Sequence, residues 1–180
     1  MKTKSIFFVL LSFTCLLSSG QKYKSTESEV RFFSDAPLED IKAVTNAASA
    51  IIDTEKQTLA IVVPIRTFQF KKKLMQEHFN ENYLESEKYP HGIFKGKITS
   101  WDGSAGSFDA VADGTLEIHG VEREVVIEGI LEKSKKEIEL ETTFVIQLAD
   151  HEIDIPKAVF YKIAEEVEII AKFKLQPYEK

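Results

Sequence analysis

A single short stretch, residues 74–90, carries most of the side chains that could do chemistry. It reads LMQEHFNENYLESEKYP and combines a histidine, two asparagines and three aromatic residues. His78, Asn80, Asn82 and Tyr83 are the polar groups nearest to its apolar positions. Such groups either bond to the free carbonyls at a helix end or hold the polar head of an amphiphilic ligand at a pocket mouth. The sequence leaves both readings open.

The other reactive residues form no catalytic or metal-binding pattern. No nucleophile elbow, phosphate loop or zinc motif is present. The four histidines lack the H-x-x-x-H spacing of a metal site, and the only cysteine is Cys15. We therefore predict no catalytic residue, no metal ligand and no cofactor, and we do not expect an enzyme. An envelope enzyme that acts on a lipid through His78 is the least favoured alternative.

One helix is predicted, over residues 70–84, because apolar side chains recur there at helical spacing. The lysines at 71–73 would face water on the opposite side. The helix would present two neighbouring stripes toward the rest of the protein, formed by Phe70, Leu74 and His78 and by Met75, Phe79 and Tyr83.

Most of the remaining chain alternates between apolar and polar residues, which indicates strands with one dry face. The alternation is strictest in 137–148 and 166–175, and this pattern is typical of antiparallel sheet. Pro64 cannot donate to a ladder, so a strand should end, bulge or form an edge there. A turn is expected at Asp113-Gly114. The predicted strands are 29–34, 39–46, 47–53, 57–65, 92–100, 107–112, 115–119, 123–131, 137–148 and 166–175.

Many one-sided strands joined by short turns predict an all-β sandwich or barrel. Closure into a barrel would remove exposed strand edges. A barrel of about eight strands is just wide enough for side chains or one slender ligand. The helix would then cover an end or a flank of the barrel. The strand pattern alone does not separate barrel from sandwich.

Residues 1–20 are typical of a secretory signal peptide. Lys2 and Lys4 precede an apolar run over 6–17, and small residues follow at 18–20. This run is shorter than the roughly 20 residues that span a bilayer. We therefore expect cleavage near Gly20 and a secreted or periplasmic protein. Lipidation of Cys15 is disfavoured, because Ser12-Phe13-Thr14 differs from the usual Leu-small-small sequence.

Residues 21–180 are expected to form one acidic domain. Without Lys2 and Lys4 they hold 21 basic and 29 acidic side chains, a formal charge of −8. Such a surface repels phosphate backbones and anionic membranes. We predict no nucleic-acid binding and no stable membrane insertion, and the sequence leaves a homodimer open.

Several segments, in order, resemble the YceI-like family, small secreted bacterial β-barrels of lipocalin-like shape that bind polyisoprenoid lipids. The resemblance covers nearly all of residues 21–180. It implies an antiparallel up-and-down barrel of about eight strands with one short helix, and an isoprenoid or other long-chain lipid as ligand. The segments that carry it are 74–90, FSDAP at 33–37, VPI at 63–65 with FQF at 68–70, FKGKI at 94–98, GTLEIHGV at 114–121 and DHEIDIP at 150–156.

The resemblance and the apolar faces together predict a binding protein that transports or sequesters a lipid. The alternative is an envelope protein-interaction module whose barrel is filled and holds no small ligand. Gly96 and Gly129 are expected to leave room inside. Each apolar candidate could equally be ordinary core. The predicted ligand-binding residues are Phe68, Phe70, Met75, His78, Phe79, Asn82, Tyr83, Phe94, Ile98, Phe144, Ile146 and Phe173.

Overall fold

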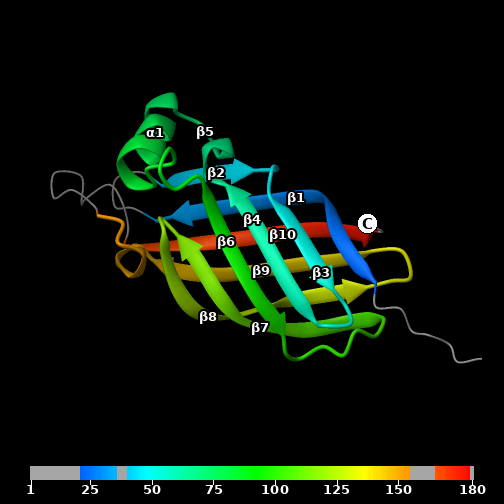
Figure 1. Cartoon of the computed structure of the whole chain (residues 1–180). Helices are drawn as coiled ribbons and strands as arrows, with labels where there is room; N and C mark the ends of the chain where they lie inside the picture. The colour runs from blue at the N-terminus through cyan, green and yellow to red at the C-terminus, as the bar shows by residue number, and fades with distance from the viewer. Residues whose placement is uncertain (1–20, 36–39, 155–164, 179–180) are drawn as a thin grey trace, which may run out of the picture.

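A ten-stranded antiparallel sheet forms the framework of the computed structural model, which describes residues 21–35, 40–154 and 165–178 (Figure 1). The signal-peptide prediction lies outside these residues. The strands are β1 (Lys22–Ser34), β2 (Ile41–Thr45), β3 (Ser49–Asp53), β4 (Thr58–Pro64), β5 (Gln69–Phe70), β6 (His91–Ile98), β7 (Gly106–Ile118), β8 (Val121–Lys133), β9 (Ile138–Gln147) and β10 (Glu166–Pro177).

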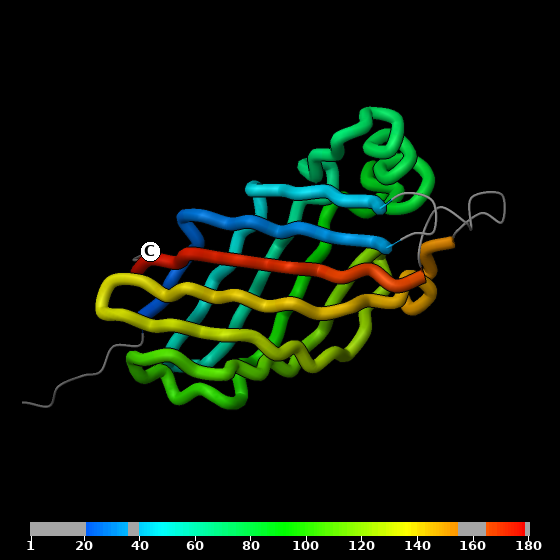
Figure 2. Tube along the Cα trace, turned by 180° about the vertical axis from the view of Figure 1, so that it is seen from behind, coloured from blue at the N-terminus to red at the C-terminus, as the bar shows by residue number. Residues whose placement is uncertain are grey.

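The sheet closes on itself because its first and last strands pair. The order β10-β9-β8-β7-β6-β4-β3-β1 is completed by a β1–β10 ladder that runs from Tyr23–Pro177 to Phe33–Glu168. On its other edge, β1 pairs first with β3 and then, nearer its end, with β2. The short strand β5 pairs with β2 and lies outside the closed ring. In Figure 2, β1, β10, β9 and β8 lie side by side as one wall. The predicted antiparallel eight-stranded barrel with one short helix is confirmed.

Alternating side chains explain why β9 and β10 form this wall. Leu140 faces inward opposite Phe173, and both side chains are buried. The intervening residues face outward, where Lys172 Nζ lies 2.7 Å from Glu141 Oε1. Such exposed ion pairs contribute roughly 0–1 kcal/mol each. The burial of the inward row is therefore what holds the strands in register.

The turn predicted at Asp113-Gly114 is wrong, because β7 is one continuous strand. Gly114 pairs with both Gly96 and Val125, so it lies inside two ladders. A Cβ at Gly114 would collide with the backbone of Lys95. Gly114 therefore marks a close approach of two strands.

The chain turns instead at His119 and Gly120. Their φ angles are 55° and 74°, and the flanking residues Ile118 and Val121 pair directly. Two positive φ values in a two-residue loop are typical of a type I′ hairpin turn.

The predicted helix over 70–84 is shorter than expected. Phe70 belongs to β5, and the α-helix α1 covers only Lys73–His78. A wider π-helical turn, η2 (Phe79–Tyr83), follows, and Leu84 N donates to Phe79 O at 2.9 Å. Together with the 3-10 turn η1 (Ile65–Thr67), these elements make a helical segment over one end of the barrel (Figure 1).

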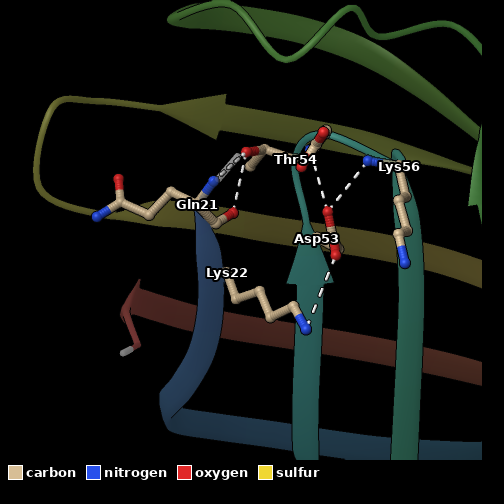
Figure 3. A network of polar contacts seen from close by, with 6 residues as sticks. Gln21, Lys22, Asp53, Thr54 and Lys56 are labelled. Carbon is tan, nitrogen blue, oxygen red and sulfur yellow. Dashed lines mark hydrogen bonds and ion pairs between the residues drawn. The ribbon is translucent and has the colours of Figure 1, made fainter. Parts of the chain in front are cut away.

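The opposite end of the barrel is packed solid. Six large side chains at this end are at most 2% exposed, and the largest of them, Trp101, donates from Nε1 to Ser104 O at 3.0 Å. Beside these side chains, polar contacts join the start of β1 to the β3–β4 turn (Figure 3). Thr54 Oγ1 donates to Gln21 O at 2.9 Å, and Lys22 Nζ lies 4.0 Å from Asp53 Oδ2. We call these six buried side chains the plug: Tyr23, Ile52, Trp101, Leu131, Ile138 and Leu175.

Two histidines tie the hairpin turn to its surroundings at the helical end. His119 Nε2 lies 2.9 Å from Oε2 of Glu85, a residue in the loop after η2. The His119 ring packs edge-on against the Tyr89 ring, with the ring centroids 4.6 Å apart. His119 Nδ1 lies 3.2 Å from the carbonyl oxygen of His151, in the 3-10 turn η3 (Leu148–His151). The buried His151 ring reaches back to the carbonyl oxygen of Val121, 3.2 Å from Nδ1.

Substitution of Gly114 by alanine should destabilise the barrel, because the added methyl group meets backbone atoms. We expect a loss of about 1–3 kcal/mol in the free energy of unfolding, measured by urea denaturation. Gly92→Ala is the matched control on the neighbouring strand, since its Cβ would meet nothing closer than 3.7 Å. Equal effects of the two substitutions would contradict this interpretation of Gly114.

Acidification should weaken the fold through His151. Burial lowers the pKa of His151, with Arg123 acting in the same direction. The unfolded chain then takes up this proton at higher pH than the folded chain, so the free energy of unfolding should fall below about pH 6.5. For one proton, the free energy of unfolding should change with pH by at most about 1.4 kcal/mol per pH unit.

The measurement is urea denaturation of the wild type, His151→Gln and His91→Gln at a series of pH values. His91→Gln serves as the control, because His91 is exposed at the start of β6. The His151→Gln protein should lose part of the slope. A slope identical in all three proteins would show that His151 does not cause it.

Candidate functional site

The half of the barrel nearest α1 is hollow. It encloses a cavity of about 580 Å³, walled by inward-facing side chains of the strands and by the helical segment. The cavity exists because small residues, Ala110, Ala112, Gly129 and Ala171, occupy inward positions at this level. The packed end has Trp101 and other large side chains in the equivalent space. Side-chain size therefore divides one continuous barrel into the plug and the hollow half around the cavity, which we call the chamber.

An aromatic cluster joins the helical segment to the barrel wall. Phe32 of β1 stacks on Phe79 of η2 with ring centroids 5.3 Å apart. Phe68 and Phe70 contact both rings at 5.0–5.7 Å, in tilted or edge-on geometry. Such pairs add about 0.5–1.5 kcal/mol each beyond their buried area. All four rings also line the cavity, so this cluster forms part of its roof.

The cavity reaches solvent beside α1. Leu74 lines it and is nevertheless 64% exposed, which places Leu74 on the rim. Lys72 and His78 also line the cavity and are exposed. A mouth with an apolar rim and a few polar groups suits an amphiphilic molecule whose tail enters first.

The polar groups at this mouth have defined hydrogen-bonding roles. The Asn82 amide donates to His78 Nδ1 at 2.9 Å, so a neutral His78 carries its proton on Nε2. Burial raises the pKa of Tyr83, so its hydroxyl stays protonated at neutral pH. His78 and Tyr83 can therefore each donate a hydrogen bond toward a ligand head group.

Ten of the twelve predicted ligand-binding residues line the cavity. Asn82 does not; its side chain is exposed and bonds to His78. Phe173 does not, because its inward side chain belongs to the packed part of the barrel. The ten are Phe68, Phe70, Met75, His78, Phe79, Tyr83, Phe94, Ile98, Phe144 and Ile146. That they contact a ligand stays a prediction.

The two glycines expected to leave room differ. Gly129 lines the cavity, whereas Gly96 does not. A Cβ on Gly96 would lie 2.6 Å from both Asp113 O and the Phe94 ring, so that space is already filled. Asn80 takes the helix-end role, since its amide donates to Gln76 O at 2.8 Å and its side-chain oxygen accepts from Ser86.

Several lining residues were missed by the sequence analysis. They lie on the inward rows of β1, β4, β7 and β10, and the period-two alternation was the signal that could have found them. They include Phe32, Leu59, Leu116, Val167, Ile169 and Ala171.

The described residues hold no group of three His, Cys, Asp or Glu side chains placed to bind a metal ion. In the same part of the chain, no helix has the length and apolar character needed to cross a membrane.

Comparisons with solved structures show the same fold in bacterial proteins of low sequence identity. A polyisoprenoid binding domain from Saccharophagus degradans, implicated in plant cell wall breakdown, has a TM-score of 0.74 at 13% identity over 87% of this chain and 98% of that chain. BcnA from Burkholderia cenocepacia has a TM-score of 0.66 at 17% identity, over 82% and 94% of the two chains. The YceI protein from Campylobacter jejuni has a TM-score of 0.58 at 14% identity, over 100% of both.

Sequence comparison provides the family. No curated protein matches the chain. The model of the YceI-like domain matches residues 22–175, which include every strand but the end of β10. The chain therefore belongs to the YceI-like family.

Proposed function

We propose that this protein is a secreted or periplasmic binding protein that holds one long apolar molecule, a polyisoprenoid or similar lipid, for transport or sequestration. The observation that carries the proposal is the apolar cavity of about 580 Å³ with its mouth beside α1. The description of the Saccharophagus degradans domain as polyisoprenoid binding supports the ligand class. The signal-peptide pattern of residues 1–20 supports export.

The ligand would lie with its tail among the cavity-lining aromatic and aliphatic side chains and its polar head near the mouth. His78 Nε2–H and the Tyr83 hydroxyl would donate hydrogen bonds to the head group. Asn82 would act as a positioning residue, because it fixes the His78 tautomer. The residues proposed to contact the ligand are the ten predicted ones that line the cavity.

Energetics favour reversible carriage. Moving one CH₂ group out of water stabilises the complex by about 0.8 kcal/mol. The competing environment for such a lipid is a membrane, which is also apolar, so transfer from bilayer to barrel should be close to neutral. The barrel then protects the enclosed part of the tail from water without holding it permanently.

The alternative function, a protein-interaction module, was expected to have a filled barrel. The cavity in the half nearest α1 disfavours it. An interaction module would keep its affinity for a partner protein when a larger side chain fills the cavity, whereas a lipid-binding protein would lose its affinity for the lipid. The two functions therefore differ in their response to substitutions inside the chamber.

Protein purified from a bacterial periplasm should carry a lipid. Organic extraction followed by mass spectrometry should recover one apolar compound in near-stoichiometric amount. Heat-denatured and refolded protein serves as the empty control. Repeated recovery of no lipid, together with no uptake of added farnesol, would contradict the proposal.

Filling the chamber should abolish binding without unfolding the barrel. Ala171→Phe places a ring in the cavity, and we expect at least a tenfold loss of farnesol affinity by isothermal titration calorimetry. Ile170→Phe is the matched control, because residue 170 is the next position on β10 and does not line the cavity. Its affinity should stay within twofold of wild type. Unchanged binding by Ala171→Phe would argue for the interaction module.

A further inference from the structure

The barrel wall contains an interruption between β8 and β9. Their ladder runs from Lys133–Ile138 to Gly129–Thr142 and ends there, where Thr142 Oγ1 donates to Glu128 O at 2.5 Å. Both strands continue, β8 back to Val121 and β9 on to Gln147, paired only with their other neighbours. Figure 1 shows β8 curving away from β9 toward the α1 end. Within the described residues, no ladder joins 121–128 to 143–147.

This interruption is bounded at both ends, so we name it the β8–β9 window. One end is the Gly129–Thr142 pair. The other is η3, where His151 contacts the carbonyl oxygen of Val121. The β9 side of the window is five residues long, roughly 16 Å at about 3.3 Å per residue.

Burial changes where the ladder ends. Leu131, Ile138 and Leu140, on the paired part, are 0%, 0% and 6% exposed. Beside the window the inward-facing Ile127, Phe144 and Ile146 are only half-buried, although all three line the cavity. The cavity therefore extends to the window from inside.

The outer rim of the window is apolar. Outward positions on β8 and β9 are mostly glutamate, for example Glu124 and Glu141. Val126 on β8 and Val145 on β9, which flank the window, are instead 65% and 55% exposed. Ile130, just beyond the end of the window, is 50% exposed. Apolar side chains thus lie on both the inner and outer faces of the wall where the ladder is interrupted.

The capacity of the cavity makes such an opening relevant. The hollow part is limited to the half of the barrel nearest α1, because large buried side chains fill the other half. A chain of nine isoprene units is three times as long as a farnesyl chain of three. We therefore expect a farnesyl chain to fit inside the cavity and a nine-unit chain to extend beyond it.

We infer that the β8–β9 window is a lateral opening through which the distal part of a long polyprenyl chain leaves the cavity, while its head stays at the α1 mouth. The inference rests on the proposed lipid-binding function and extends its ligand class to chains longer than the cavity. The occupant is an apolar chain because both faces of the window are apolar.

The test closes the window with a removable link. Val126→Cys and Val145→Cys, in a Cys15→Ser background, are joined by a short bismaleimide that contains a reducible disulfide. The control link joins Val145→Cys to Glu168→Cys, which are register partners in the continuous β9–β10 ladder. Affinities for farnesol and for solanesol, with nine isoprene units, are measured by partition from phosphatidylcholine vesicles.

The 126–145 link should lower solanesol affinity at least tenfold and farnesol affinity less than twofold, and reduction should restore both. The control link should change neither. Unchanged solanesol affinity, or equal loss with both links, would overturn the inference while leaving lipid binding intact. Binding of neither prenol to unlinked protein would instead refute the proposed function, and the inference with it.

A second measurement asks whether the window is open without ligand. Phe144→Cys should react with pyrene maleimide at least tenfold faster than Leu140→Cys, because both face inward but only residue 144 borders the window. Equally slow labelling of both would show that side chains close the window, and would overturn the inference.

Discussion

The ladder between β1 and β10 is the interaction on which the rest of the structure depends. It joins the two ends of the described chain and turns a curved sheet into a closed wall. Without it, β1 and β10 would each present a long unpaired edge, which invites association with other chains. The inward row of every strand would also lose its opposite wall. Core and cavity are therefore both consequences of closure.

Within the closed wall, side-chain volume decides where the protein is solid. Trp101 and Tyr23 fill one half, and alanines at 110, 112 and 171 leave the other half hollow. Atoms that line a void forgo the dispersion contacts that a packed core would provide. The plug supplies stability that the chamber cannot. This division resembles the general trade-off in which a binding site is less stable than an optimised core.

Period-two alternation made most of the fold predictable from the sequence. It identified β9 and β10 nearly to the residue, and the aromatic and histidine spacing located the helical segment at the mouth. The sequence left open whether the polar start of β1 pairs as a strand, because Lys22 to Ser28 lack a clear apolar row. Gly114 was taken for a turn because glycine serves both turns and close strand contacts. Its inward row, Ala112, Gly114 and Leu116, continues in phase through that position.

Features that depend on how distant segments meet were not predictable. Phe173 and Phe144 have the same alternation, yet Phe173 is buried away from the cavity whereas Phe144 lines it. The end of the β8–β9 ladder is likewise a matter of strand curvature, which a single sequence does not encode locally. The contact between His119 and Glu85 also joins residues far apart in the chain, so no local pattern indicates it.

The pairing of the first strand with the last has a kinetic consequence. Contacts between the two ends of a sequence carry the largest loop-closure entropy, and folds dominated by such contacts form slowly. The barrel cannot close until β10 has been synthesised, so the nascent chain stays open throughout translation. This delay suits the export proposed above, because a chain that has not yet closed can still be threaded through a translocation pore.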